Sequence, residues 1–126
     1  MSNHLFLADD NQQFRRYVRK TAERSGWTVT ECGDGYELLT ALDQFSSRGI
    51  VILDIVMPGM EGVETLQNIA GIDREIPLYL ISGRHPTYLE LAKLFGDAHS
   101  LNIIETLSKP ISAQRLRGIF STWKNH

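Results

Sequence analysis

The chain has 126 residues, of which 42% are hydrophobic, and this size favours one domain spanning residues 1–126. Thirteen basic and fifteen acidic residues give a formal charge of −2, so composition offers no electrostatic reason to expect binding to nucleic acid or to an anionic membrane. No apolar stretch approaches the roughly 20 residues that cross a bilayer, and the start, MSNHLFLADD, becomes acidic too early for a signal peptide, so we expect a cytoplasmic protein.

Strand-like and helix-like segments alternate along the chain. In the first half, the expected elements are a strand at 4–8 (HLFLA), a helix at 11–25 that ends before Gly26, a strand at 27–31 (WTVTE), a helix from Asp34 or Gly35 with Leu38, Leu39, Leu42 and Phe45 on one face, a strand at 49–54 (GIVILD) and a helix near 61–70. In the second half, they are a strand at 77–82 (PLYLIS), a helix at about 86–95, a strand at 102–107 (NIIETL) and a helix from Ser112 that bears Leu116, Ile119, Phe120 and Trp123.

Strict alternation of strand and helix predicts an α/β fold with one parallel sheet and helices on both faces. The reason is that each parallel crossover needs a connection of about a dozen residues. Folds of this doubly wound class place their sites outside the carboxyl ends of the strands, at the point where the strand order reverses. Polar residues with chemistry should therefore follow directly after strands.

Polar side chains do follow four of the five predicted strands. Asp9 and Asp10 come after the first strand, Asp54 ends the third, Ser82 ends the fourth, and Lys109 follows the fifth. A single aspartate at a strand end is most often a cap or turn residue, so the argument rests on the set. Within it, Asp54 is the most informative, because an unpaired carboxylate at the end of a fully apolar strand is costly.

Three carboxylates at one edge of the sheet require a positive partner. Each pair ~4 Å apart repels by about 4 kcal/mol at an effective dielectric constant of about 20. Mg²⁺ suits such a site, because it takes oxygen ligands and binds through one or two carboxylates together with waters and phosphate oxygens. We expect Asp10 and Asp54 each to supply an oxygen and Asp9 to hold a metal-bound water, with the backbone carbonyl of Val56 as a further ligand.

The remaining two polar residues suit the anionic oxygens of a phosphoryl group. Lys109 brings a compact ammonium and Ser82 a hydroxyl, and both would face a group transferred in line to Asp54. With the dication and the lysine neutralising the charge that develops, Asp54 is the expected nucleophile.

Four short motifs occur in order across almost the whole chain: ADD (8–10), LDIVMPGMEG (53–62), LIS (80–82) and SKP (108–110). Together they resemble the receiver domain of two-component response regulators. Each motif alone is common, but four at matching strand ends form a specific set. The resemblance implies a flavodoxin-like (βα)5 fold with strand order 2-1-3-4-5.

The resemblance also implies roles and partners. Asp54 would accept a phosphoryl group from a histidine kinase or phosphotransfer protein, with Mg²⁺ at Asp9 and Asp10, Lys109 on the phosphoryl group and Ser82 as the switch hydroxyl. Such a phosphoprotein catalyses only its own phosphorylation and dephosphorylation, and it controls an output domain or a partner protein. No direct contact with nucleic acid or with a membrane is expected, and homodimerisation is left open.

Prolines and glycines in these motifs are expected to shape the backbone around the site. By analogy with the family, Pro110 would follow a cis peptide bond, the isomer that proline tolerates. Pro58, Gly59 and Gly62 would shape a loop that leaves the Asp54 carboxylate accessible.

The sequence departs from the family pattern at three positions. Most similar receivers have Tyr or Phe three positions before Lys109, where this chain has Thr106, so the aromatic toggle is absent and the route of switching stays open. Val56 and Arg84 stand where family members flank the path of the water that hydrolyses phosphoaspartate. Neither side chain can act as a base there, so we expect slow dephosphorylation.

The segment between Ser82 and Lys109 is a few residues longer than is usual in the family. Its sequence, in particular LISG and LNIIETLSKP, is similar to that of receivers that precede EAL-type cyclic-di-GMP phosphodiesterase domains. If this weaker match holds, these residues are the N-terminal part of a longer protein. The region of the fourth helix would then contact the output domain or a second copy.

Other readings of the same residues are less well supported. A haloacid-dehalogenase-type phosphatase needs a second Asp where this chain has Val56, and a flavodoxin needs a phosphate cradle where ADDNQQ would repel phosphate. The four histidines and Cys32 lack zinc-site spacing, and Cys32 is expected to be inert. The main alternative is a receiver-like interaction module that works without phosphorylation, favoured by Thr106 and disfavoured by the intact acidic set.

Overall fold

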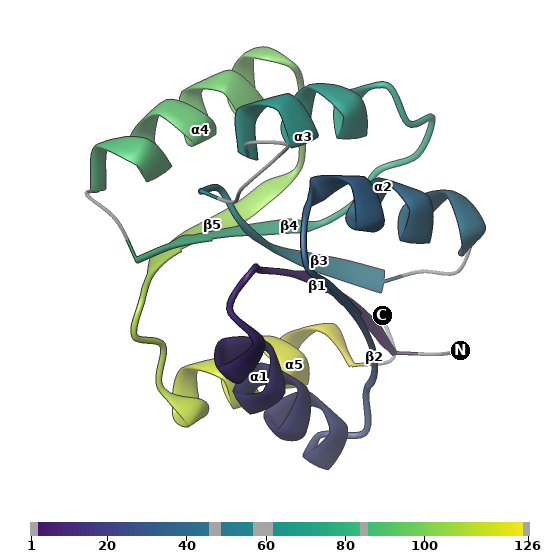
Figure 1. The fold of residues 1–126 in the computed structure, drawn as a ribbon, viewed down its shortest axis with the longest axis vertical. Coiled ribbons are helices and arrows are strands. Elements are labelled where there is room, and N and C mark those ends of the chain that lie inside the picture. The colour runs from purple at the N-terminus through teal and green to yellow at the C-terminus, as the bar shows by residue number, and fades with distance from the viewer. Residues whose placement is uncertain (1–2, 46–48, 57–61, 84–85, 125–126) are drawn as a thin grey trace.

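The computed structural model describes residues 3–45, 49–56, 62–83 and 86–124, and strands and helices alternate through them (Figure 1). The strands are β1 (His4–Ala8), β2 (Thr28–Cys32), β3 (Gly49–Asp54), β4 (Leu78–Ser82) and β5 (Ile103–Ser108). The helices are α1 (Gln12–Arg24), α2 (Gly35–Gln44), α3 (Gly62–Ala70), α4 (Pro86–Ala98) and α5 (Ala113–Trp123).

All neighbouring strands are parallel, and their order is β2-β1-β3-β4-β5. The predicted flavodoxin-like α/β fold is therefore confirmed. Ala8 of β1 pairs with Leu53 of β3, so the next residues, Asp9 and Asp54, lie side by side at the edge where the strands end. The strand order reverses between β1 and β3, which is the position that such folds use for their sites.

Helices cover both faces of the sheet, with α1 and α5 below it and α2, α3 and α4 above it in Figure 1. Successive residues of a strand point to opposite faces, so each strand feeds two hydrophobic clusters. The upper cluster includes Phe6, Val51, Leu53, Leu66 and Leu80. The lower cluster includes Leu5, Leu7, Ile52, Ile81 and Phe120. Because β3 is buried from Ile50 to Asp54, its sequence is a continuous apolar run rather than an alternating one.

Capping residues explain where three of the helices begin. The side chains of Asn11, Asp34 and Ser112 each accept a hydrogen bond from the backbone N–H three residues further on. At its other end, α1 ends before Gly26, as the sequence predicted, and Gly26 has a φ of 87°, a left-handed conformation that glycine adopts without strain. Asn11 matters most for function, because it starts α1 directly after the Asp9–Asp10 pair.

Two boundaries differ from the sequence prediction. Helix α4 continues to Ala98 instead of ending near residue 95. Phe45, which was expected on the buried face of the second helix, is instead the extended residue that ends α2, and 40% of it is exposed. Its ring stacks on His4 with the two ring centroids 5.2 Å apart. The predicted loop residues Pro58 and Gly59 lie outside the described residues.

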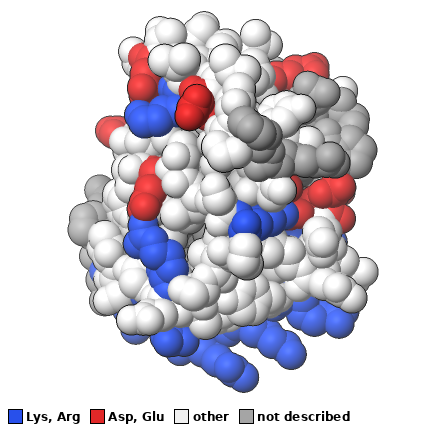
Figure 2. Space-filling view, turned by 90° about the vertical axis from the view of Figure 1, so that its left-hand side faces the viewer, with Lys and Arg blue, Asp and Glu red and all other residues white. Residues whose placement is uncertain are grey.

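Charge is unevenly distributed over this fold. Helix α1 alone carries five of the thirteen basic residues and one of the fifteen acidic residues. Figure 2 shows Lys and Arg gathered at the lower end of the molecule, the end that α1 and α5 form in Figure 1. Within the described parts of the chain, no helix combines the length and apolar character needed to span a membrane.

Candidate functional site

Three carboxylates meet at the carboxyl edge of the sheet. One oxygen from each of Asp9, Asp10 and Asp54 can be chosen so that all three lie within 4.8 Å of one another. Asp9 is fully buried and Asp54 is 5% exposed, whereas Asp10 faces solvent. The parallel register produces this arrangement, because it ends β1 and β3 at the same level. The structure therefore brings together the three acids that the sequence analysis selected.

Backbone hydrogen bonds orient the two buried carboxylates. Asp9 Oδ1 accepts a hydrogen bond from the N–H of Asn11 at 2.8 Å, and Asp54 Oδ1 accepts one from the N–H of Val56 at 2.9 Å. Each carboxylate thus uses one oxygen to hold the loop that follows its own strand. Its second oxygen, Oδ2, is left to face the cationic residue of the site.

Lys109 supplies that cation. Its Nζ lies 2.6 Å from Asp9 Oδ2 and 3.2 Å from Asp54 Oδ2, and 4.3 Å from the centre of the Phe14 ring. Its backbone N–H donates to the Ser82 carbonyl at 2.9 Å, which extends the pairing of β5 with β4 by one residue. The peptide bond between Lys109 and Pro110 is cis, as expected.

Burial and charge set the ionisation of this cluster. Burial raises the pKa of Asp54, and the neighbouring Asp9 charge adds to this increase against the opposing effects of the Val56 N–H and of Lys109. Burial alone would lower the pKa of Lys109, but its hydrogen bond to Asp9 and the charge of Asp54 outweigh that effect and raise it. Lys109 therefore stays charged, while the charge on Asp54 is energetically costly.

The donor set fits Mg²⁺. Asp9 Oδ2 is buried and faces the Lys109 ammonium at 2.6 Å, and no other described residue donates a hydrogen bond to it. Carboxylate oxygens from two strand ends, one of them on the exposed Asp10, are ligands of the hard type that Mg²⁺ prefers. Val56 adjoins Asp54 through its N–H, and its carbonyl remains a predicted ligand.

The other predicted site residues are placed as follows. Ser82 is fully buried at the end of β4, next to the residue that pairs with Asp54. Thr106 is half-buried in β5, where it pairs with Leu80. Arg84 lies outside the described residues. The Lys109 side chain also passes Gly83, where an added Cβ would sit 3.5 Å from Lys109 Cδ.

Sequence reasoning missed two residues that touch the site. Phe14 supports the Lys109 ammonium, and Arg15 donates a hydrogen bond from Nη1 to the backbone carbonyl of Asp9 at 2.5 Å. Their position in the sequence was a usable signal. Both stand in the first turns of α1, and helical side chains lean toward the helix N-terminus, which here adjoins the acidic pair.

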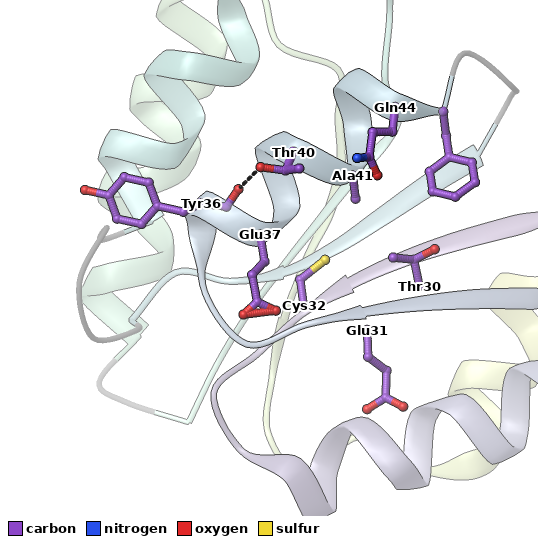
Figure 3. Close-up of a pocket in the computed structure, with 9 residues that line it drawn as sticks. Thr30, Glu31, Cys32, Tyr36, Glu37, Thr40, Ala41 and Gln44 are labelled. Carbon is purple, nitrogen blue, oxygen red and sulfur yellow. Dashed lines mark hydrogen bonds between the residues drawn. The ribbon is translucent and has the colours of Figure 1, made fainter.

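A separate shallow hollow of about 340 Å³ lies between β2 and α2 (Figure 3). Its lining residues are Thr30, Glu31, Cys32, Tyr36, Glu37, Thr40, Ala41, Gln44 and Phe45. None of them is a predicted site residue. Burial raises the pKa of the Cys32 thiol to about 12, which fits the expectation that this cysteine is unreactive.

Residues 5–121 match the family model of the response regulator receiver domain. Among curated proteins, the chain is 31% identical over 112 residues to the C4-dicarboxylate transport transcriptional regulatory protein DctD of Rhizobium meliloti, a match that covers 89% of this chain and 23% of DctD. It is 28% identical to the response regulator receiver protein CpdR of Brucella abortus, covering 89% of this chain and 88% of CpdR. The chain thus spans about a quarter of DctD but most of CpdR.

Solved structures share the fold over nearly the full chain. A response regulator from Colwellia psychrerythraea superposes with a TM-score of 0.80 at 27% identity, covering 97% of this chain and 96% of that one. The chemotaxis protein CheY4 of Vibrio cholerae has a TM-score of 0.79 at 21% identity, over 97% of this chain and 98% of that one. At that lower identity, the likeness to CheY4 concerns the fold alone.

Proposed function

This chain belongs to the family of response regulator receiver domains, and we propose that Asp54 is its phosphoacceptor in a Mg²⁺-dependent reaction. One observation carries the proposal. Asp54 is a buried carboxylate with one oxygen 3.2 Å from the Lys109 ammonium, and two further acids lie within 4.8 Å of it. A buried acid between a cation and a dication site is suited to attack a phosphoryl group, because the charge that develops is met by preorganised partners.

Each residue has a defined task in this reaction. The N–H of Val56 holds Asp54 Oδ1, which leaves Oδ2 as the attacking oxygen. The bond from phosphorus to the donor nitrogen of a phosphohistidine breaks as the bond to Asp54 Oδ2 forms, and the electron pair leaves with the imidazole. Asp10, Asp54 and the Val56 carbonyl would hold Mg²⁺, which would supply positive charge against the phosphoryl oxygens. Asp9 orients a water at that site, and Lys109 moves from the carboxylates to the incoming phosphoryl group.

Ser82 is proposed as the residue that reports phosphorylation. It is buried at the end of β4, beside the strand that carries Asp54, so its hydroxyl can turn to a phosphoryl oxygen on Asp54. Because Thr106 takes the place of an aromatic side chain in β5, the proposed switch runs through Ser82 and the segment that leads to α4.

The proposed partners are a histidine kinase or phosphotransfer protein as donor, and an output domain or partner protein as target. DctD, which this chain resembles in part, is named a transcriptional regulatory protein, and the matched segment covers 23% of its length. Control of a further domain is therefore a proposal here, as is a cytoplasmic setting. That this further domain is of the EAL type remains a prediction from the sequence similarity of the segment between Ser82 and Pro110.

Helix α4 is the proposed contact surface for output or for a second copy of the chain. Three of its large apolar residues are exposed: Tyr88 by 52%, Leu91 by 57% and Leu94 by 66%. They recur at every third residue of the helix, and large apolar side chains exposed close together are typical of interaction sites. The helix follows Ser82 along the chain, so movement of that residue is transmitted to this surface.

Beryllium fluoride with Mg²⁺ tests the proposed function, because it mimics a phosphoryl group on an aspartate. We expect amide shifts around Asp54 and Ser82 in NMR spectra, and we expect them to vanish in Asp54→Asn. Shifts that persist in Asp54→Asn, or no shifts in the wild type, would favour the interaction module that works without phosphorylation.

A further inference from the structure

Arg15 connects β2, a strand at the edge of the sheet, to the backbone of Asp9 directly after β1. It stands in the first turns of α1, and only 17% of its side chain is exposed. Its Nε donates to Glu31 Oε1 at 3.1 Å, and its Nη1 donates to the Asp9 carbonyl at 2.5 Å. The planar guanidinium therefore spans from β2 to the first residue after β1, using two donors of its fixed fork.

The Asp9 carbonyl lies where the pairing of β1 with β2 ends. The N–H of Asp9 still donates to Cys32 at 3.0 Å, which continues the pairing of β1 with β2. Beyond that point β2 offers no further strand partner, and Arg15 supplies the donor instead. The carbonyl belongs to the peptide unit that joins Asp9 to Asp10, so fixing its oxygen fixes the plane from which both carboxylates leave the backbone.

Glu31 is itself held from two sides. Figure 3 shows its side chain pointing from β2 toward α1, on the opposite face of the strand from Cys32. There it also accepts from Arg19 Nη1 at 2.8 Å. Although burial raises the pKa of Glu31, the hydrogen bonds from Arg19 and Arg15 outweigh burial and hold that pKa below its usual value. Glu31 is thus a fixed anion that orients the Arg15 fork.

We propose that Arg15 is a positioning residue for the dication site, acting on Asp9 and Asp10 through the Asp9 carbonyl. This inference rests on the proposed function, because it assumes that these acids bind Mg²⁺. At the acidic pair, Arg15 donates to the Asp9 backbone carbonyl and not to the side-chain carboxylate of Asp9 or Asp10, so it orders this backbone without occupying the oxygens that a dication needs. Removing a residue that orients metal ligands without binding the metal itself typically weakens metal affinity by about 10-fold to 100-fold.

The test measures Mg²⁺ affinity directly, with the amide NMR shifts of Asp10 and Val56 followed during a Mg²⁺ titration. In Arg15→Gln we expect the dissociation constant for Mg²⁺ to rise by about 10-fold. The Mg²⁺ concentration that gives half-maximal labelling by acetyl phosphate should rise by a similar factor. The labelling rate at saturating Mg²⁺ should stay within about threefold of the wild type, because only ground-state positioning is lost.

Arg19→Gln is the matched control, since it removes an ion pair of Glu31 without touching Asp9. We expect it to change the Mg²⁺ dissociation constant by less than about twofold, whereas Glu31→Gln should give a larger increase because it releases the Arg15 fork. Arg15→Lys, which keeps a donor but not the fork, should lie between wild type and Arg15→Gln.

Each outcome decides one point. Folded Arg15→Gln with wild-type Mg²⁺ affinity would overturn the role of Arg15. If Arg15→Gln does not fold, Arg15→Lys and Glu31→Gln take its place, and affinities equal to that of Arg19→Gln would overturn the inference. A wild-type protein that binds no Mg²⁺ would instead contradict the proposed function itself.

Discussion

The Lys109 ammonium lies closer to Asp9, at 2.6 Å, than to Asp54, at 3.2 Å. The proposed nucleophile is therefore the weaker partner of the only cation that contacts these two carboxylates among the described residues. Its pKa is raised, chiefly because burial penalises its charge. Keeping Asp54 ionised therefore lowers the stability of the fold. A stability cost of this kind is common at residues that are required for function.

Replacing Asp54 by Asn should stabilise the fold at pH 7. A folded pKa above the unfolded value means that the ionised form disfavours the native state, so this penalty is present at high pH. It disappears as the pH falls toward the ordinary aspartate pKa of about 3.9. We expect a gain of about 1 kcal/mol in the free energy of unfolding at pH 7, measured in urea without Mg²⁺. Lower stability of Asp54→Asn at pH 7, or a gain that grows on acidification, would contradict this.

Replacing Lys109 by Gln should separate metal binding from chemistry. The variant leaves the carboxylates without their cation, so we expect a loss of about 3 kcal/mol in the free energy of unfolding in the absence of Mg²⁺. Mg²⁺ should bind more tightly than in the wild type, because a competing cation is gone, and should restore part of the lost stability. Labelling of Asp54 by acetyl phosphate should nevertheless slow. Weaker Mg²⁺ binding in Lys109→Gln would show that the lysine does not compete for these oxygens.

The predicted fold and strand ends were accessible from the sequence for a physical reason. The apolar runs stop at the carboxyl edge of the sheet, so the polar residues Asp9, Asp54 and Ser82 mark the strand ends directly, although all three are buried. Helix starts were visible through the capping chemistry of Asn11 and Ser112. The alternation of strands and helices then indicated a parallel sheet, in which the carboxyl ends of all strands lie at the same edge.

Other features depend on packing that no spacing reveals. Helical periodicity placed Phe45 on a buried helix face, but periodicity does not distinguish a last helical turn from an extended residue that stacks on a distant histidine. Arg15 is one of five basic residues in α1, and its contact with the Asp9 carbonyl depends on how α1 lies against β2. The sharing of Lys109 between two acids likewise follows from side-chain geometry.

Gly62 should tolerate no side chain. An added Cβ there would lie 2.4 Å from the backbone of Ile55, the residue after Asp54, and the N–H of Gly62 donates to the Ile55 carbonyl at 3.0 Å. Gly62→Ala should therefore cost about 3 kcal/mol and disturb the loop after β3. Gly118→Ala is the control, because nothing lies within 4 Å of its added Cβ in α5, and it should add about 1 kcal/mol. Urea unfolding of both variants compares them, and equal effects would contradict the close approach.

The phosphorylated protein should lose its phosphoryl group slowly. Val56, two residues after Asp54, offers no group to orient a hydrolytic water, and Arg84, outside the described residues, offers no base. We expect decay over many minutes in Mg²⁺ at neutral pH, followed by intact mass after removal of the phosphodonor. Replacing Val56 by Asn, which can hold a water by hydrogen bonds, should shorten the lifetime. A wild-type lifetime of seconds would exclude this account of the two positions.

The central claim is that Asp54 attacks phosphorus with help from a dication held by neighbouring acids. The most direct measurement is mass spectrometry of the protein after incubation with acetyl phosphate, with peptide mapping of the modified residue. We predict one phosphoryl group per chain, located on Asp54, formed with Mg²⁺ and not with excess chelator, and absent in Asp54→Asn. Labelling at another residue, or equal labelling of wild type and Asp54→Asn, would contradict the account.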